Sequence, residues 1–363
     1  MTPEDRQPWV QPSPAGEAER LRSRSPKVSV ITPSYNQARF LERTIRSVLD
    51  QGYANLEYIV IDGGSTDGSV DIIRRYADRL AFWVSEPDGG QANAVNKGMA
   101  RVTGDIVGWV NSDDFYYPGA IHMAVDAFAI DPTLGFVYGR GNRVDDCEAL
   151  IEPFAFTRPF NVETLAHGVD YILQPTVFMR RSALAAVDPL DPKLQWTLDW
   201  DLWIRLGRKF PASMIDHLTA ASREYAATKT SRGGFERLAE IQRVVRRHTG
   251  DEVSVGYLNY LMFTLIDALP PSGVPAQARM AAAIHEVAAV CGDLLRRDKV
   301  WQPPAPDAIR DRLVMGADPW RTRRLLRVPG LGRRVLRRMV PLPARRAIGG
   351  FLERILLRLL NSL

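Results

Sequence analysis

Short apolar runs alternate with amphipathic runs between residues 28 and 138. The apolar runs are rich in β-branched and aromatic residues, which is typical of buried strands. Strands are predicted at 28–32, 56–62, 81–85, 105–110 and 135–138. Helices are predicted at 40–51, 68–76, 91–100 and 120–130. This alternation predicts an α/β fold with a mostly parallel sheet and helices on both faces.

The pattern changes beyond Arg223, where strand signals fade and helical spacing continues. Helices are predicted at 232–249, 253–269 and 277–297, before a proline-rich stretch. The predicted organisation is a disordered leader at 1–26, an α/β domain at 27–230, a helical extension at 231–302, a linker at 303–319 and a tail at 320–363.

Composition fits a globular protein, with 45% hydrophobic and 25% charged residues. The proline-rich start does not resemble a signal peptide, and no run of about 18 apolar residues predicts a spanning helix. Cys147 and Cys291 are isolated and lack metal-ligand spacing. A reducing compartment, the cytoplasm, is therefore expected.

The segment 320–363 is strongly basic. It contains twelve arginines and one glutamate, a net charge of +11, so the rest of the +5 chain carries −6. Leucine, isoleucine and phenylalanine recur there at helical spacing, which favours a basic amphipathic helix on the inner face of the cell membrane. Packing on protein is the alternative. Nucleic acid is disfavoured because the segment holds two aromatic residues, too few for base stacking.

Candidate chemistry is concentrated where the fourth predicted strand ends, in Asn111-Ser112-Asp113-Asp114. Ligands of open α/β sheets bind at the carboxyl ends of the strands, and carboxylates there suit Mg²⁺ or Mn²⁺ with phosphate. Asp and Asn are also ordinary turn residues. The first three strands also end in polar runs, at 32–36, 62–68 and 86–91. Four such ends in succession favour a shared binding crevice.

Five stretches within 27–229 resemble the family 2 glycosyltransferases, inverting enzymes of the GT-A fold. They are VSVITPSYNQARFLERTIRSVLDQ, YIVIDGGSTDGS, SEPDGGQANAVNKGM, GWVNSDD and TLDWDLWIRLG. The resemblance implies a GT-A domain at 27–230, a nucleotide-sugar donor carrying UDP, GDP or dTDP, a divalent metal, and inversion at the anomeric carbon. A glycan or lipid-linked hydroxyl acceptor is expected, in cell-surface polysaccharide or glycolipid assembly.

The resemblance also implies a set of donor-binding residues. Asp62 is expected at the base or ribose, because a carboxylate accepts hydrogen bonds from a base N–H or a hydroxyl. An Asx turn is the alternative for Asp62, and a solvated helix face for Lys97. The expected nucleotide-sugar contacts are Thr32, Pro33, Tyr35, Asp62, Ser65, Asp88, Gln91, Asn93, Lys97, Asn111, Arg223 and Lys229.

The metal ligands implied by the resemblance are Asp113 and its neighbour Asp114. Asn111 replaces the first aspartate of the family's D-x-D pattern, which puts metal affinity in doubt. In the late loop, Tyr225 occupies a position where the family often has histidine, so a metal or phosphate contact there is doubtful. Arg223 and Lys229 remain candidate phosphate partners.

The stretch Leu198–Asp201 resembles the family's E-D motif with leucine in place of glutamate. Asp199 then corresponds to the catalytic base, which removes the acceptor hydroxyl's proton in a direct displacement. Enclosure of Asp199 is expected to raise its pKa. Asp201 is the second candidate, and a helix N-terminal acid is the structural alternative. Gln174 and Trp200 are expected on the acceptor side.

Two other functions remain open. A nucleotidyltransferase also uses strand-end carboxylates and a metal, but it normally has a glycine-rich phosphate loop after its first strand. Here that place holds Pro33-Ser34-Tyr35-Asn36-Gln37. A non-catalytic nucleotide-sugar-binding module would explain Asn111 and Leu198 at two carboxylate positions of the family.

Overall fold

The computed structural model describes residues 25–168 and 170–251, together with Gly16, residues 19–21, Tyr257 and Tyr260. The chain divides into two compact units. The first comprises Met1–Val162 and Asp170–Arg232, and the second comprises Glu163–Val169 and Gly233–Leu363. The predicted helices at 253–269 and 277–297, the linker, the basic tail and most of the leader lie outside the described residues.

The first unit is built on a nine-stranded sheet with the order β3-β2-β1-β4-β8-β6-β9-β5, and β7 pairs with β6. Strands β1 to β4 are parallel to one another, whereas β8 is antiparallel to both β4 and β6. The strands are β1 (Val28–Ser34), β2 (Leu56–Asp62), β3 (Phe82–Ser85), β4 (Ile106–Trp109), β5 (Phe115–Tyr116), β6 (Phe136–Val144), β7 (Leu150–Pro153), β8 (Val177–Arg180) and β9 (Ala212–Arg223).

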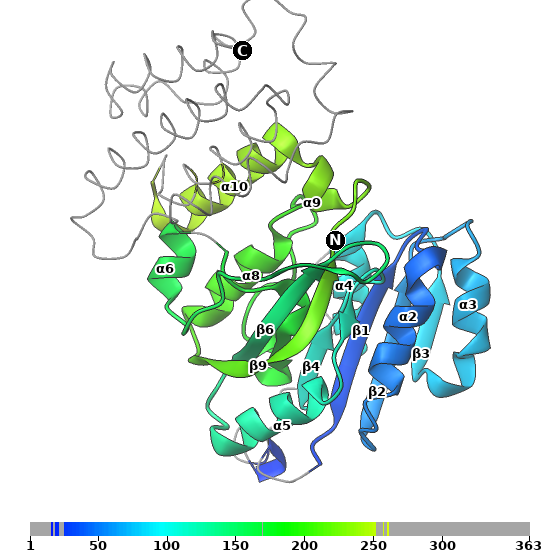
Figure 1. The fold of residues 1–363 in the computed structure, drawn as a ribbon. Helices are drawn as coiled ribbons and strands as arrows, with labels where there is room; N and C mark the ends of the chain where they lie inside the picture. The colour runs from blue at the N-terminus through cyan, green and yellow to red at the C-terminus, as the bar shows by residue number, and fades with distance from the viewer. Residues whose placement is uncertain are drawn as a thin grey trace, which may run out of the picture. The chain divides into compact units, whose positions relative to one another are not determined.

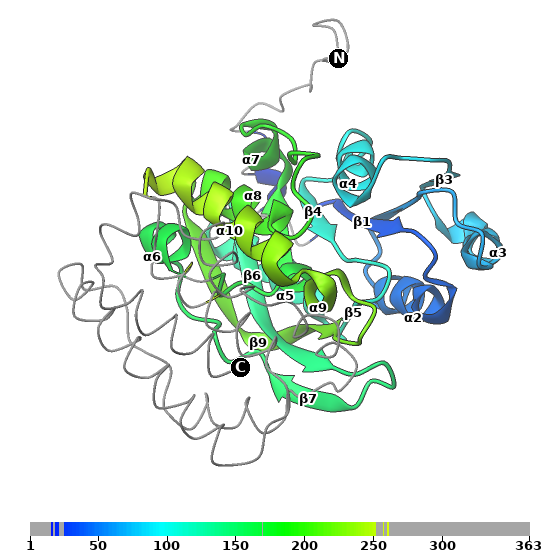
Figure 2. The same ribbon diagram turned by 90° about the horizontal axis from the view of Figure 1, so that it is seen from above.

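Helices cover both faces of the sheet, and Figure 2 shows α2 and α4 on opposite sides of β1. One buried cluster joins α2, α3 and α5 to residues of β1 and β2 (Figure 1). On the other face Gly98 of α4 lies against Ile31, where an added Cβ would be 2.5 Å from a methyl carbon. The helices are α2 (Ala38–Leu49), α3 (Ser69–Arg75), α4 (Gln91–Met99), α5 (Ala120–Ile130), α7 (Arg181–Ala185), α8 (Leu198–Gly207) and α9 (Lys229–Arg232), with 3₁₀ turns η2 (Ala77–Arg79) and η3 (Gln174–Thr176).

The predicted α/β fold class is confirmed, and the predicted strands and helices up to α5 lie within two residues of their predicted bounds. Strand β6 extends to Val144, six residues beyond its predicted end, and β5, β7, β8 and β9 were not predicted. Strand β7 is exposed along its whole length, and most of the first half of β9 is only half-buried, so neither has an apolar run. Strand β9 is stabilised by its pairing with β6, which extends over every residue of β6. This pairing joins residues far apart in the sequence, so the local sequence of β9 does not predict a strand.

The amino ends of the strands are closed by a buried carboxylate, Glu57. It accepts hydrogen bonds from Lys27 Nζ at 2.6 Å, Ser29 Oγ at 2.5 Å and Thr103 N at 2.8 Å. Burial by itself would raise the pKa of Glu57. The hydrogen bonds together outweigh burial and lower the pKa to about 2.

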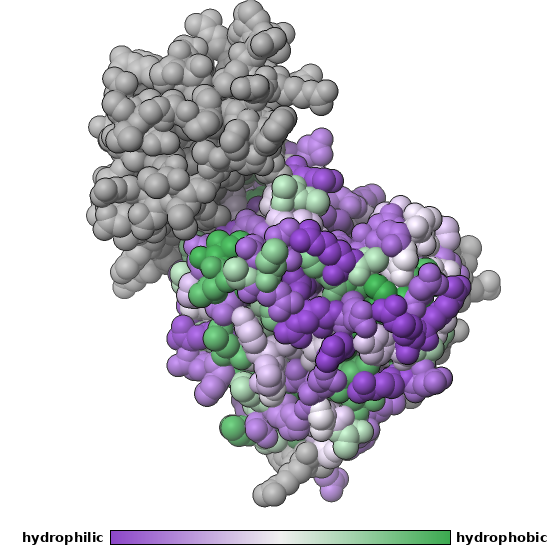
Figure 3. Space-filling view, turned by 45° about the vertical axis from the view of Figure 1, so that its right-hand side comes forward, coloured by the Kyte–Doolittle hydropathy of each residue, from purple (hydrophilic) through white to green (hydrophobic). Residues whose placement is uncertain are grey.

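On the face in Figure 3, hydrophobic residues form small patches separated by hydrophilic ones. The large apolar side chains exposed among the described residues are Tyr35, Ile130, Leu150, Ile151 and Leu218. Within the same part of the chain, no helix has both the length and the apolar character needed to cross a bilayer.

The second unit contains α10 (Gly234–Thr249), close to the predicted helix at 232–249. Its buried side chains Leu238, Ile241, Val244 and Val245 recur at helical spacing. The helix ends at Gly250, whose φ of 80° is the left-handed conformation that glycine adopts readily at a helix C-terminus. A shorter helix, α6 (Val162–His167), lies almost wholly in this unit.

Candidate active site

The four polar strand ends meet at one edge of the sheet because their strands are parallel and in register. Ser34 pairs with Asp62, Asp62 pairs with Ser85, and Ile31 pairs with Trp109. The polar runs after β1, β2, β3 and β4 therefore start from a common edge, as a shared crevice requires.

Asp62 is completely buried and organises the loop after β2. Its Oδ2 accepts hydrogen bonds from Gly64 N at 3.1 Å, Ser65 N at 2.8 Å and Ser85 Oγ at 2.7 Å. Its Oδ1 accepts one from Ser65 Oγ at 2.6 Å. This arrangement is that of the Asx-turn alternative. The carboxylate therefore shapes the loop that follows β2.

A glycine beside this turn leaves room for Asp88. An added Cβ on Gly63 would be 2.9 Å from the carboxylate of Asp88, so the absence of a side chain admits that carboxylate. Asp88 in turn accepts a hydrogen bond from Gly90 N at 2.7 Å, just before α4. The expected donor residues Ser65 and Asp88 thus lie in two loops that contact each other.

The end of β1 separates the three residues expected at the nucleotide. Thr32 is fully buried, and its hydroxyl lies 3.0 Å from that of Tyr58. Pro33 is also buried, whereas Tyr35 is 63% exposed. Of these three, Tyr35 presents a ring that a base could contact, and Thr32 belongs to the core.

Asn111, after β4, has an amide that takes part in four hydrogen bonds. Its Oδ1 accepts from Gln91 Nε2 at 2.8 Å and Trp109 Nε1 at 2.9 Å. Its Nδ2 donates to Gln174 Oε1 at 3.0 Å and to Asp114 Oδ2 at 3.3 Å. Three predicted site residues, Gln91, Gln174 and Asp114, are therefore brought together around Asn111.

The two adjacent aspartates differ in exposure. Asp113 is half-buried, and its Oδ2 accepts a hydrogen bond from Tyr225 Oη at 3.1 Å. Asp114 is 3% exposed and accepts one from Arg223 N at 2.9 Å. Burial raises the pKa of both carboxyls, and the Asp113 charge raises that of Asp114 further.

Arg223 contacts this loop, and its side chain is 2% exposed. It donates to the Asp113 carbonyl and to Glu148, and it lies 4.8 Å and 5.0 Å from the ring centres of Phe40 and Phe115. These contacts give Arg223 a scaffold role at this loop.

Lys97 and Lys229 also have partners that distinguish them. Lys97 forms an ion pair with Glu86 at 2.8 Å, so it is engaged on the α4 surface. Lys229 Nζ donates to Gln91 Oε1 at 2.9 Å, and Gln91 contacts Asn111. Lys229 is therefore the lysine that the structure connects to the strand-end network. An added Cβ on Gly89 would lie 3.0 Å from Asn93 Nδ2, so Asn93 lies beside the loop before α4.

At the start of α8, Asp199 and Asp201 lie in different surroundings. Asp199 is half-buried, and its Oδ1 accepts a hydrogen bond from Trp200 N at 2.9 Å. Asp201 is 1% exposed and pairs with Arg205 at 2.8 Å. Trp200 is 2% exposed, so its ring belongs to the core and not to an acceptor surface.

Two contacts of this region were not predicted from the sequence. Tyr225 Oη reaches Asp113 and also accepts a hydrogen bond from Gln37 Nε2 at 3.1 Å. Its position, where the family often has histidine, was the available signal. Trp196 Nε1 donates to the Lys229 carbonyl at 3.1 Å, which links the segment before α8 to Lys229. No local pattern pointed to Trp196.

Asp113 is the residue of this loop that fits a divalent cation. The four hydrogen bonds of Asn111 use all the donor and acceptor positions of its amide, and Asp114 is enclosed. One carboxylate is enough for Mg²⁺ or Mn²⁺ when substrate phosphates and water complete the shell.

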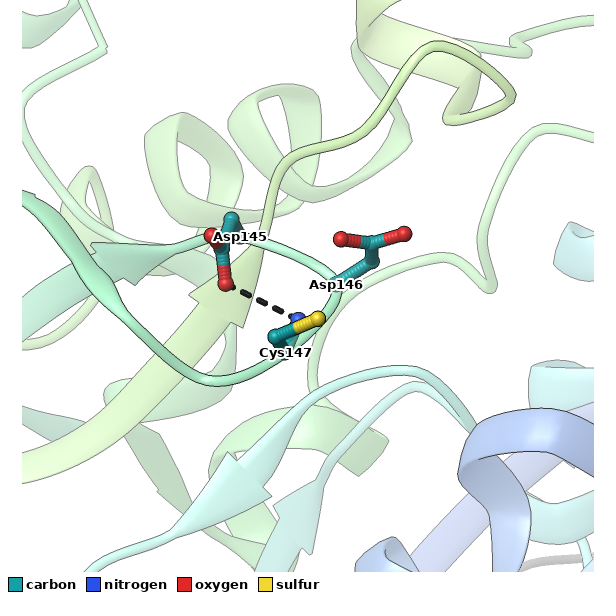
Figure 4. A group of neighbouring side chains, drawn as sticks. All are labelled: Asp145, Asp146 and Cys147. Atoms are coloured by element: carbon teal, nitrogen blue, oxygen red, sulfur yellow. Dashed lines mark hydrogen bonds between the residues drawn. The ribbon is translucent and has the colours of Figure 1, made fainter.

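A second acidic group, Asp145, Asp146 and Cys147, lies in the turn between β6 and β7. Figure 4 shows the hydrogen bond from Cys147 N to Asp145, which measures 2.9 Å. Asp145 also accepts from Ala149 N at 2.8 Å, and Asp146 pairs with Arg39 at 2.8 Å. These contacts build a tight turn and explain the cluster without an ion.

Solved structures share this architecture. A mannosyltransferase from Pyrobaculum calidifontis, crystallised with GDP-Man and Mn²⁺, superposes with a TM-score of 0.51 at 17% identity, over 94% of this chain and 91% of its own. S. aureus TarS 1–349 with UDP-GlcNAc gives a TM-score of 0.50 at 17% identity, over 80% and 92%. The fold is that of the GT-A glycosyltransferases.

Sequence comparison identifies the family. Residues 29–187 match the family model described as Glycosyl transferase family 2. An uncharacterised glycosyltransferase of Nostoc sp. is 30% identical over 187 residues, 49% of this chain and 56% of that protein. One from Mycobacterium tuberculosis is 34% identical over 170 residues, 46% and 63%. The chain carries a family 2 glycosyltransferase domain, which the motifs predicted, and the match spans little more than half of the Nostoc protein.

Proposed function

We propose that this protein is a metal-dependent inverting glycosyltransferase that moves a hexosyl group from a nucleotide-sugar donor to a hydroxyl acceptor. The observation that carries the proposal is the half-exposed Asp113 carboxylate beside a network that contains Gln91 and Lys229. The enzymes of similar fold have structures with UDP-GlcNAc or with GDP-Man and Mn²⁺, which supports a donor of this class.

The donor side of the proposed reaction uses groups of this chain that remain accessible. Tyr35 offers an exposed ring for a nucleobase, and Lys229 offers a positive charge near the diphosphate. Asp113 would hold a Mg²⁺ or Mn²⁺ ion, which supplies charge that stabilises the leaving nucleoside diphosphate.

Asp199 is proposed as the base. In an inverting transfer the acceptor oxygen attacks the anomeric carbon while the bond from that carbon to the diphosphate oxygen breaks. The acceptor hydroxyl's proton passes to the base on the face opposite the leaving group. Asp199 is the better candidate than Asp201 because Asp201 is buried against Arg205.

A screen for the donor tests this function most directly. Thermal unfolding of the full chain is followed with UDP-, GDP- and dTDP-sugars, each with and without Mn²⁺ or Mg²⁺. One class of nucleotide sugar is expected to raise the midpoint, and to do so more with metal, because a ligand that binds the folded state stabilises it. Release of nucleoside diphosphate from that donor then measures turnover.

The outcomes separate the alternative functions. Pyrophosphate release from a nucleoside triphosphate would instead indicate a nucleotidyltransferase. Tight nucleotide-sugar binding without transfer or hydrolysis would indicate a binding module. Retention of configuration in the product would overturn the inverting mechanism.

We also propose that the segment 320–363 brings the enzyme to the inner face of the cell membrane, to a lipid-linked or glycan acceptor. Its +11 charge supports binding to anionic lipid. Sedimentation with anionic vesicles, compared with and without residues 320–363, is the test. Equal partition of the two proteins would contradict this proposal.

A further inference from the structure

Asn111 stands where the family's D-x-D pattern has its first aspartate, and its surroundings explain the amide. An asparagine side chain offers two acceptor and two donor positions, and all four are used here. The acceptor positions receive Gln91 and Trp109, and the donor positions serve Gln174 and Asp114. The two donor and two acceptor positions of the amide therefore each have a hydrogen-bonding partner of the opposite kind.

Two partners of Asn111, Gln91 and Gln174, come from other parts of the fold, and two, Trp109 and Asp114, are its neighbours along the chain. Gln91 begins α4, Trp109 ends β4, Gln174 begins η3, and Asp114 lies in the loop after β4. Two of them extend the network. Gln91 accepts a hydrogen bond from Lys229, and Gln174 Nε2 donates to the Trp109 carbonyl at 2.8 Å. One side chain thus joins the expected donor, metal and acceptor sides of the site.

An aspartate at this position would conflict with two of the four partners. A carboxylate accepts hydrogen bonds and donates none, whereas Gln174 Oε1 and Asp114 Oδ2 are both acceptors. The new carboxylate would also lie against Asp114, which is 3% exposed and adjacent to Asp113. An added charge is costly there, because burial disfavours the charged form of a carboxyl group.

We propose that Asn111 is a positioning residue and not a weakened metal ligand. Its uncharged amide holds Gln91, Gln174 and Asp114 in the arrangement that the transfer uses, and it leaves Asp113 as the carboxylate of residues 111–114 that faces a donor. The proposal rests on the proposed function for its catalytic consequence, but the hydrogen-bond requirement stands without it.

The test is the substitution that restores the family pattern, Asn111→Asp, in the full chain. Its kcat is expected to fall about tenfold or more, as for other outer partners of metal-site residues. Turnover is expressed per nucleotide-binding site, so unfolded protein does not contribute. The affinity for Mn²⁺ in the presence of nucleoside diphosphate, measured by calorimetry, is expected not to rise. Faster transfer together with tighter Mn²⁺ binding would overturn the proposal.

Two further variants distinguish a specific positioning role of Asn111 from a general loss of structure. Asn142→Asp removes one donor from a half-buried asparagine, whose Nδ2 meets Tyr117 Oη at 3.0 Å, and is expected to keep wild-type kcat. The exchange Asn111→Asp with Asp114→Asn restores one donor–acceptor pair and is expected to recover several-fold of the lost kcat. An exchange that is no better than Asn111→Asp would contradict the proposal.

Failure of the proposed function has a different signature. In that case wild-type protein transfers no sugar. The thermal unfolding midpoints of the variants then test whether residue 111 must be an amide to satisfy its four hydrogen bonds. Asn111→Asp is then expected to unfold at a lower temperature than Asn142→Asp, with partial recovery in the exchange. Equal midpoints of Asn111→Asp and wild type would overturn the requirement.

Discussion

Two pairs of aspartates, Asp113–Asp114 after β4 and Asp199/Asp201 at the start of α8, use the same residue type in two ways. In each pair one carboxylate is half-buried and the other is nearly inaccessible, at 3% for Asp114 and 1% for Asp201. The accessible members are the candidates for chemistry. The buried members are hydrogen-bonded to the scaffold, so exposure and partners, not residue type, distinguish the roles.

The contacts that hold Asp114 and Asp201 differ in sequence separation. Asp114 is held by the backbone N–H of Arg223, at the end of β9, so it depends on the whole sheet being assembled. Asp201 is held by Arg205, one turn further along the same helix. The first contact is tertiary and the second is local, which is why helical spacing alone can suggest the second.

The largest expected effect is that of Asp199→Asn on turnover. Loss of a general base lowers rate by about 10²–10⁴-fold, so kcat is expected to fall by that factor while the unfolding midpoint changes little. Product release under saturating donor and acceptor measures it. Wild-type turnover in this variant would exclude Asp199 as the base.

The matched substitution Asp201→Asn is expected to act on stability instead. Removing one partner of a buried ion pair costs about 3–5 kcal/mol, because the remaining charge is left uncompensated. Urea unfolding of the variant and of wild type gives the difference. If the free energy of unfolding is unchanged and turnover is lost, the roles of Asp199 and Asp201 are reversed.

A third carboxylate, that of Glu57, lies at the opposite end of the sheet, and its expected role is purely structural. Its pKa is lowered from 4.5 to about 2, so its charged form contributes stability above pH 4.5, which is lost as pH falls through about 2. Wild type is expected to exceed Glu57→Gln by about 3 kcal/mol at pH 7, and by less than half of that at pH 3. Urea unfolding at both pH values checks this, and a difference independent of pH would contradict it.

The smallest expected effect is on the affinity for Mn²⁺, which should depend more on Asp113 than on Asp114. Asp113→Asn is expected to weaken Mn²⁺ binding in the presence of nucleoside diphosphate by about 10–100-fold, within the range measured for other metal-site groups. Asp114→Asn keeps an oxygen for Arg223 N and is expected to weaken it less. Calorimetric titration measures both. A larger loss in Asp114→Asn would assign the ion to the buried carboxylate.

Much of the first half of the chain could be predicted because its signals are local. The apolar runs that became β1 to β4 lie within two residues of their predicted bounds, and the parallel alignment of their ends followed from the α/β pattern. The polar residues after each strand therefore shared an edge. The roles of Thr32, Trp200 and Arg223 could not be predicted, because burial depends on which face of an element the rest of the fold covers.

The sequence by itself determined the fold class, the resemblance to a family and the edge of the sheet where chemistry is expected. These follow from the spacing of hydrophobic residues and from short sequence motifs, both of which involve residues close together in the chain. Only the tertiary structure decided which carboxylates are accessible. It placed Tyr225 on Asp113, enclosed Asp114 beneath Arg223 and surrounded Asn111 with partners from four segments. Gln91, Gln174, Arg223 and Tyr225 are distant in sequence from this loop, so only the folded chain brings them beside it.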